Sequence, residues 1–134
     1  MPGFIGGAVR GNAGAFSGEI KDGILEVVSL DYSKKIPKVI NRTNRQCQFK
    51  YRDSIFKSGK NSGQEIILEA VFKLNPGNKK GIKKAIEDKI AWRELRQPLD
   101  YPNIGSIFKN VDFNLVPKKW QKSEEIKKHV KTDP

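Results

Sequence analysis

The sequence of 134 residues predicts an α+β protein, and three observations support this class. An apolar run at residues 24–30 is followed, after a turn-like segment, by a second run at 35–40 that contains Pro37, which is typical of a hairpin with an edge strand. Residues 65–74 alternate between two faces, as a strand does. Residues 79–95 carry apolar side chains at helical spacing, which predicts an amphipathic helix.

The opening segment, residues 1–18, holds six of the chain's twelve glycines and almost no charge. Such a density indicates close backbone packing or a ligand lying against the main chain. The segment lacks the lysine of a Walker P-loop and the preceding strand of a Rossmann fingerprint. A short helix or turn between Gly6 and Ala15 would still offer N–H groups to a phosphate, and a glycine-rich surface loop is the alternative.

Local patterns define the elements that follow. Thr43 and Gln46 have the spacing of a capping box, so a single helical turn is expected there. A polar turn is expected at 58–63. In the strand at 65–74, one face is expected to carry Ile66, Leu68, Ala70, Phe72 and Leu74.

The second part of the chain begins after Asn75-Pro76-Gly77, which breaks the chain and predicts a boundary between residues 1–75 and 76–134. Pro98 and Pro102 exclude regular structure up to Ser106. A short helix is expected in the tail, where Ile126 and Val130 lie four residues apart.

The composition limits the classes of function. The formal charge of +11 favours anionic partners, which are nucleic acid, an acidic membrane or phosphorylated ligands. A single cysteine, Cys47, and a single histidine, His129, exclude an intramolecular disulfide framework and a zinc cluster of these residues. No run approaches the roughly 20 apolar residues of a membrane span, and no secretory signal is visible, so we expect a cytoplasmic protein.

Two polar clusters have the composition of a site. The run GSIFKN at 105–110 combines a hydroxyl, an ammonium and a carboxamide, and its Ile107 and Phe108 are expected to anchor it in a core while the polar groups face a cleft. The run YRDSIFK at 51–57 is the second cluster. The alternative for the first run is a short strand entering a loop with a solvated lysine.

Three segments, in the same order, resemble the bacterial UDP-N-acetylenolpyruvoylglucosamine reductase family. They are PGFIGGAVRGNAGA at 2–15, FKYRDSIFK at 49–57 and RELRQPLDYPNIGSIFKN at 93–110. The resemblance implies that residues 1–75 form the second FAD-binding subdomain, an antiparallel sheet with short helices. It implies that residues 76–134 begin an α/β substrate-binding domain. The family's first flavin subdomain and its C-terminal glutamate have no match here, and Phe16 stands where many members have tyrosine, so we expect a fragment with reduced flavin affinity.

The resemblance also implies a reaction: NADPH reduces FAD, and the flavin then reduces UDP-N-acetylenolpyruvoylglucosamine to UDP-N-acetylmuramate for peptidoglycan precursor synthesis. Arg52 matches the arginine that orients the enolpyruvyl carboxylate, and Ser106 matches the proton donor. The cofactor would lie against Gly6, Gly7, Arg10 and Gly14. The substrate-contacting positions would be Tyr51, Arg93, Arg96, Lys109 and Asn110. The expected partners are the UDP-sugar and NADPH, and neither nucleic acid nor a membrane is among them.

Two other functions remain open from the residues alone. The positive charge and aromatic residues such as Phe49, Tyr51 and Trp120 near lysines are compatible with a basic nucleic-acid-binding module. An inactive fragment that docks on a partner is the second alternative. The glycine-rich opening and the GSIFKN run would have no role in a nucleic-acid-binding module.

Overall fold

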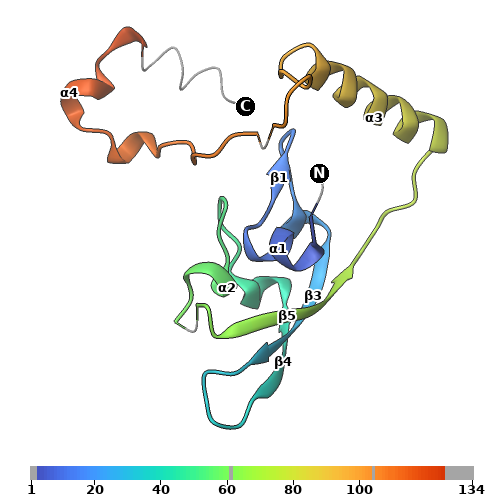
Figure 1. Ribbon diagram of the computed structural model, residues 1–134, viewed down its shortest axis with the longest axis vertical. Helices are drawn as coiled ribbons and strands as arrows, with labels where there is room; N and C mark the ends of the chain where they lie inside the picture. Colours follow the sequence, from blue (N-terminus) through green and yellow to red (C-terminus); the bar gives the residue numbers. More distant parts are fainter. Residues whose placement is uncertain (1–2, 61, 104, 126–134) are drawn as a thin grey trace. The chain divides into compact units, whose positions relative to one another are not determined.

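The computed structural model describes residues 3–60, 62–103 and 105–125 (Figure 1). The chain divides into two compact units, Met1–Asn75 and Pro76–Pro134. The predicted α+β class is confirmed, because the first unit combines antiparallel sheets with short helices. No helix in the described part is long and apolar enough to cross a membrane.

The first unit is built on a three-stranded antiparallel sheet with the order β4-β3-β5 (Figure 1). The central strand is β3 (Ile24–Asp31), and its neighbours are β4 (Lys38–Thr43) and β5 (Glu65–Phe72). The predicted hairpin is confirmed, with β4 at an edge of the sheet and Pro37 just before it. Proline is tolerated there because it need not donate to the ladder.

A β-bulge in β5 makes the predicted face wrong for Ile66 and Leu68, whereas Ala70 and Phe72 pack against the core as predicted. Val28 pairs with Glu69 and Ser29 pairs with Ile67, so Leu68 is an extra residue in the ladder. The alternation reverses at this point, because a bulge shifts the following side chains to the opposite face. Ile66 and Leu68 are therefore 51% and 56% exposed, whereas Ile67 packs against the core.

Helices α1 (Ile5–Arg10) and α2 (Ile55–Ser58) complete the core of the first unit. Its buried hydrophobic side chains are Val9, Ile24, Val27, Cys47 and Phe56. Cys47 ends a helical turn, η2 (Asn44–Cys47). The predicted capping box is present, because Thr43 and Gln46 cap this turn reciprocally.

A polar cluster joins the three strands on the core side. The guanidinium of Arg42 on β4 forms an ion pair with Glu65 on β5, and their side chains are only 13% and 3% exposed. The Ser29 hydroxyl of β3 donates to Glu65 at 2.5 Å and accepts from Arg42 at 2.8 Å. The cluster therefore fixes the register of all three strands at one level of the sheet.

The second unit contains α3 (Lys79–Glu94), η3 (Phe113–Leu115) and α4 (Lys118–Gln121). The predicted amphipathic helix is confirmed, and Asn78 caps it by accepting from the Gly81 N–H at 3.0 Å. The described residues between α3 and η3 form no helix or strand, as the prolines predict. The predicted tail helix at Ile126 and Val130, and His129, lie outside the described residues. The interpretation of this unit as the start of an α/β domain remains a prediction.

Candidate functional site

A tight two-residue turn presents the predicted arginine of the first unit. Lys50 and Asp53 exchange both main-chain hydrogen bonds, at 3.0 and 3.1 Å, and enclose Tyr51 and Arg52. Arg52 lies in the left-handed region with φ of +52°, where few residues other than glycine and asparagine are found. Such a conformation persists in a non-glycine residue only when its surroundings hold it.

The Arg52 side chain reaches back to the glycine-rich opening. Its Nη2 donates to the main-chain oxygen of Gly14 at 2.8 Å, and its Nη1 lies 3.7 Å from Glu19 Oε1. The guanidinium also lies over the Tyr51 ring, 4.9 Å from the ring centre. The side chain is 35% exposed, so it is held on one side and open to solvent on the other.

Glu19 is shared between two cations. Its Oε2 accepts from Lys21 Nζ at 2.6 Å, while its Oε1 faces Arg52. The hydrogen bond from Lys21 is the main cause that lowers the pKa of Glu19, with smaller contributions from Asn12 and from the charges of Lys21 and Arg52. The carboxylate is therefore stabilised in its charged form by the two cations.

The glycines of the opening segment fall into two kinds. Gly6 and Gly7 lie in α1, and a Cβ added to Gly7 would have no atom within 4 Å. A Cβ on Gly14 would meet the Gly18 oxygen at 2.6 Å and Arg52 Nη1 at 3.0 Å. Gly14 is thus required by the packing of the chain on itself, whereas the backbone at Gly7 is open to a ligand.

The main chain at the start of this segment is exposed. The backbone at Gly7 has no side chain over it, and Arg10 is exposed at the end of α1. Such a surface allows a planar or phosphorylated group to lie directly against the main chain. No cluster of three or more histidine, cysteine, aspartate and glutamate side chains that could hold a metal is found among the described residues.

Two buried polar residues that the sequence interpretation did not select support this site. Asn12 is fully buried and donates from Nδ2 to the Lys50 oxygen at 2.9 Å. Ser54 is 3% exposed and donates from Oγ to the Arg10 oxygen at 2.6 Å. The signal in the sequence was small: Asn12 is the one amide side chain in a run of small and apolar residues.

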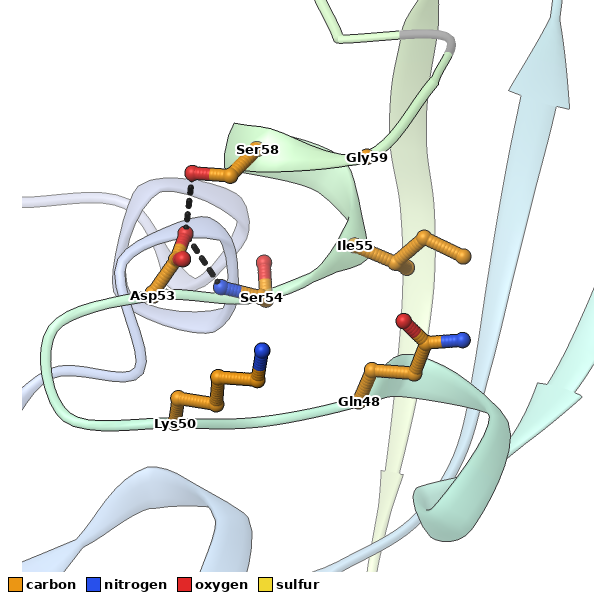
Figure 2. A pocket seen from close by; sticks show the side chains of 7 residues that line it. All are labelled: Gln48, Lys50, Asp53, Ser54, Ile55, Ser58 and Gly59. Atoms are coloured by element: carbon orange, nitrogen blue, oxygen red, sulfur yellow. Dashed lines mark hydrogen bonds between the residues drawn. The ribbon is translucent and has the colours of Figure 1, made fainter.

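A small cavity lies beside the turn, on the α2 side (Figure 2). Its volume is about 60 Å³, and its lining residues are Gln48, Lys50, Asp53, Ser54, Ile55, Ser58 and Gly59. Asp53 accepts hydrogen bonds there from the Ser54 N–H at 2.9 Å and the Ser58 hydroxyl at 2.7 Å (Figure 2). This volume holds roughly two water molecules, so it is too small for a nucleotide or a flavin.

The other predicted residues lie in the second unit. Ser106, Lys109 and Asn110 are exposed in an irregular segment, which follows Gly105 with φ of +72°. The expectation that Ile107 and Phe108 anchor this segment in a core is wrong within the second unit, because they are 74% and 87% exposed.

The predicted substrate-contacting arginines lie in the last turn of α3 and just after its end. Arg93 is in its last turn, and the guanidinium of Arg96 stacks 4.7 Å from the centre of the Trp92 ring. Arg52 belongs to the first unit and Ser106 to the second. Their meeting at one site stays a prediction.

Comparison with known proteins gave curated relatives and solved structures, while no family model matches the chain. The chain is 43% identical over 110 residues to UDP-N-acetylenolpyruvoylglucosamine reductase of Carboxydothermus hydrogenoformans, covering 82% of this chain and 34% of the relative. It is 42% identical over 109 residues to the reductase of Fervidobacterium nodosum, covering 81% and 33%. With the reductase of Staphylococcus carnosus it shares 37% identity over 124 residues, covering 92% and 38%. The chain thus spans about a third of the length of these relatives.

One similar solved structure is the crystal structure of UDP-N-acetylenolpyruvylglucosamine reductase (MurB) from Thermus caldophilus. The TM-score is 0.54 at 24% identity, and the match covers 69% of this chain and 32% of the other. At this level of identity the likeness is one of fold.

Proposed function

Because the chain belongs to the UDP-N-acetylenolpyruvoylglucosamine reductase family, we propose that it takes part in the FAD-dependent reduction of UDP-N-acetylenolpyruvoylglucosamine to UDP-N-acetylmuramate. NADPH is the reductant, and the product serves peptidoglycan precursor synthesis. In this proposal residues 1–75 form a flavin-binding subdomain and residues 76–134 belong to a substrate-binding domain.

The observation that carries the proposal is the contact between Arg52 and the glycine-rich opening. The Arg52 Nη2 donates to the Gly14 oxygen across 38 positions of sequence, so two of the three segments that resemble the family meet in space. A guanidinium held on one edge and 35% exposed can still receive a carboxylate on its open edge. We assign this role to Arg52, with the enolpyruvyl carboxylate as its ligand.

The cofactor would be held by the opening segment. Gly6 and Gly7 would bring the main chain of α1 against it, Arg10 would supply a positive charge, and Gly14 would keep the Arg52 guanidinium beside it. Bound FAD would supply the hydride for the substrate's double bond.

The remaining assignments concern the substrate. Ser106 would donate a proton from its hydroxyl to the substrate carbon next to the carboxylate. A serine hydroxyl is a weak acid, so this step needs cations that stabilise the negative charge developing on the carboxylate, and Arg52 and Lys109 are of the right type. The other substrate-binding residues would be Tyr51, Arg93, Arg96 and Asn110. For the two arginines the pyrophosphate is a bidentate partner.

A chimera tests the proposal. Residues 1–110 of this chain replace the corresponding segment of the Carboxydothermus reductase, to which the chain is 43% identical over 110 residues. We expect the chimera to bind flavin and to consume NADPH in the presence of the UDP-sugar, with formation of UDP-N-acetylmuramate. A folded chimera that binds flavin but forms no product, next to an active parent, would overturn the proposal.

A further inference from the structure

We propose that Asn12 is a positioning residue for Arg52, holding both the turn that carries the guanidinium and the segment that presents its counter-ion. This inference rests on the proposed function of Arg52 as the carboxylate-binding residue. Asn12 touches neither cofactor nor substrate in this scheme, and it acts only through Arg52.

The first support is the hydrogen bond to Lys50. The Lys50 main-chain oxygen accepts from the Asp53 N–H at 3.1 Å, which closes the turn around Arg52, and from Asn12 Nδ2 at 2.9 Å. A carbonyl oxygen has two lone pairs, so one oxygen can serve both donors. The amide of Asn12 thereby ties the base of the turn to the opening segment.

The second support runs through Lys21. The Asn12 Oδ1 accepts from the Lys21 N–H at 3.3 Å, and the Lys21 ammonium binds Glu19 at 2.6 Å. Glu19 in turn faces the Arg52 guanidinium at 3.7 Å. One side chain therefore fixes the backbone of the turn and the backbone next to the carboxylate that the guanidinium faces.

The environment of Asn12 makes these hydrogen bonds difficult to replace. The side chain is fully buried, so a lost partner cannot be replaced by bulk water without cost. Its φ of +45° lies in the left-handed region, where asparagine is among the few tolerated residues besides glycine. A substitution at this position must therefore respect the backbone as well as the side chain.

Asn44 offers a matched control. Its Nδ2 donates to the Lys21 oxygen at 2.7 Å and to the Ile24 oxygen at 2.9 Å, so it also binds main-chain oxygens in the same unit. Its bonds support the backbone at Lys21 and the start of β3, and neither bond reaches the turn around Arg52. Loss of either amide should destabilise the unit, but only loss of Asn12 should move Arg52.

The experiment compares Asn12→Gly with Asn44→Ala in the full chain, each residue being compatible with the local backbone. Two NMR signals are followed: the Arg52 Nε–Hε signal, identified by its loss in Arg52→Lys, and hydrogen exchange of the Asp53 amide. We expect Asn12→Gly to shift the Arg52 signal and to accelerate Asp53 exchange at least about tenfold, since the closing hydrogen bond loses its support. We expect Asn44→Ala to leave the Arg52 signal in place and Asp53 exchange within about twofold, at a similar loss of stability. If Asn12→Gly does not fold, Asn12→Asp, which keeps the size and the acceptor, takes its place.

An unchanged Arg52 signal in the Asn12 variant, or equal changes in both variants, would overturn the positioning role. Calorimetric titration with UDP-N-acetylenolpyruvoylglucosamine tests the proposed function separately from the positioning role of Asn12. Absence of binding by the unmodified chain counts against the proposed function, and the NMR comparison still decides on Asn12. Binding that is at least about tenfold weaker in the Asn12 variant and unchanged in the Asn44 variant supports both the proposed function and the role of Asn12. Equal affinity of the two variants overturns the role of Asn12.

Discussion

The Arg52 guanidinium donates to the Gly14 main-chain oxygen at 2.8 Å, and a Cβ on Gly14 would lie 3.0 Å from the same guanidinium. The arginine and the glycine therefore depend on each other: the glycine admits the side chain, and its oxygen orients it. This relationship connects the glycine-rich opening to the turn at Tyr51 and Arg52. Packing within the chain therefore explains why one position of the opening segment, Gly14, is a glycine.

Gly14→Ala is expected to destabilise the first unit by about 1–3 kcal/mol, the usual cost of overpacking, because the Gly18 oxygen is main chain and cannot rotate away. Gly7→Ala is the control, since nothing lies within 4 Å of its added Cβ. Replacing this glycine of helix α1 by alanine should raise the free energy of unfolding by about 0.5–1 kcal/mol. Urea unfolding followed by circular dichroism measures both. Equal midpoints for the two variants would contradict the packing argument.

Glu65→Gln is expected to lower the free energy of unfolding by about 3 kcal/mol, because it leaves the buried charge of Arg42 without its counter-ion. The control is Glu69→Gln on the same strand, where the side chain is exposed and the expected change is below about 0.5 kcal/mol. The same urea titration compares them. A loss as small as that of the control would mean that the ion pair does not fix the strand register.

The Cys47 thiol is expected to resist alkylation, since burial raises its pKa to about 11 from an ordinary value of 9.0. Reaction with iodoacetamide, followed by mass spectrometry, should be slow at pH 8 in the folded chain and fast in urea, because only the thiolate reacts. Equal rates in both states would show that the thiol is accessible and its pKa ordinary.

The same shift predicts a loss of stability in alkali. Between pH 9 and 11 the unfolded chain loses the thiol proton while the folded chain keeps it, so the unfolded state binds fewer protons and stability falls as the pH rises. Cys47→Ala should lack this part of the decline. Unfolding midpoints of the two chains at pH 8 and pH 11 measure the difference, and parallel declines would contradict the assignment.

Ser106→Ala, introduced into the chimera, is expected to lower the rate of UDP-N-acetylmuramate formation by about 10²–10⁴-fold, the usual contribution of a general acid. Consumption of NADPH without the UDP-sugar should not change, since the serine is proposed to act on the substrate alone. Ser33→Ala, in the hairpin turn, is the control. Wild-type product formation in the Ser106 variant would refute its role as proton donor.

Short-range patterns predicted the three strands of the main sheet, the helical turn after Thr43 and helix α3. The capping box at Thr43 and the helix capped by Asn78 depend on residues a few positions apart, and both are present. The bulge at Leu68 was not predictable in this way, because it is defined by the pairing of β5 with β3, about forty positions away. An alternating pattern reads the same with or without one extra residue, until the partner strand is known.

In the candidate site, too, some features were predictable from the sequence and others were not. The polar cluster at 51–57 and the glycine-rich opening were visible as compositions, and the resemblance to a family supplied their roles. The supports of Arg52 were not visible, because Asn12 and Glu19 act through partners up to 38 positions away. Such contacts follow from the tertiary fold and leave little trace in the local sequence.

The left-handed backbone of Arg52 has a consequence for protein engineering. Glycine would relieve the strain at this position but would lose the hydrogen bond to the Gly14 oxygen, so a screen that rewards only heat resistance can accept Arg52→Gly. That replacement would discard the one guanidinium aimed at the substrate carboxylate in the proposed reaction. Mutant libraries made to raise the thermal stability of this chain should therefore keep Arg52 unchanged.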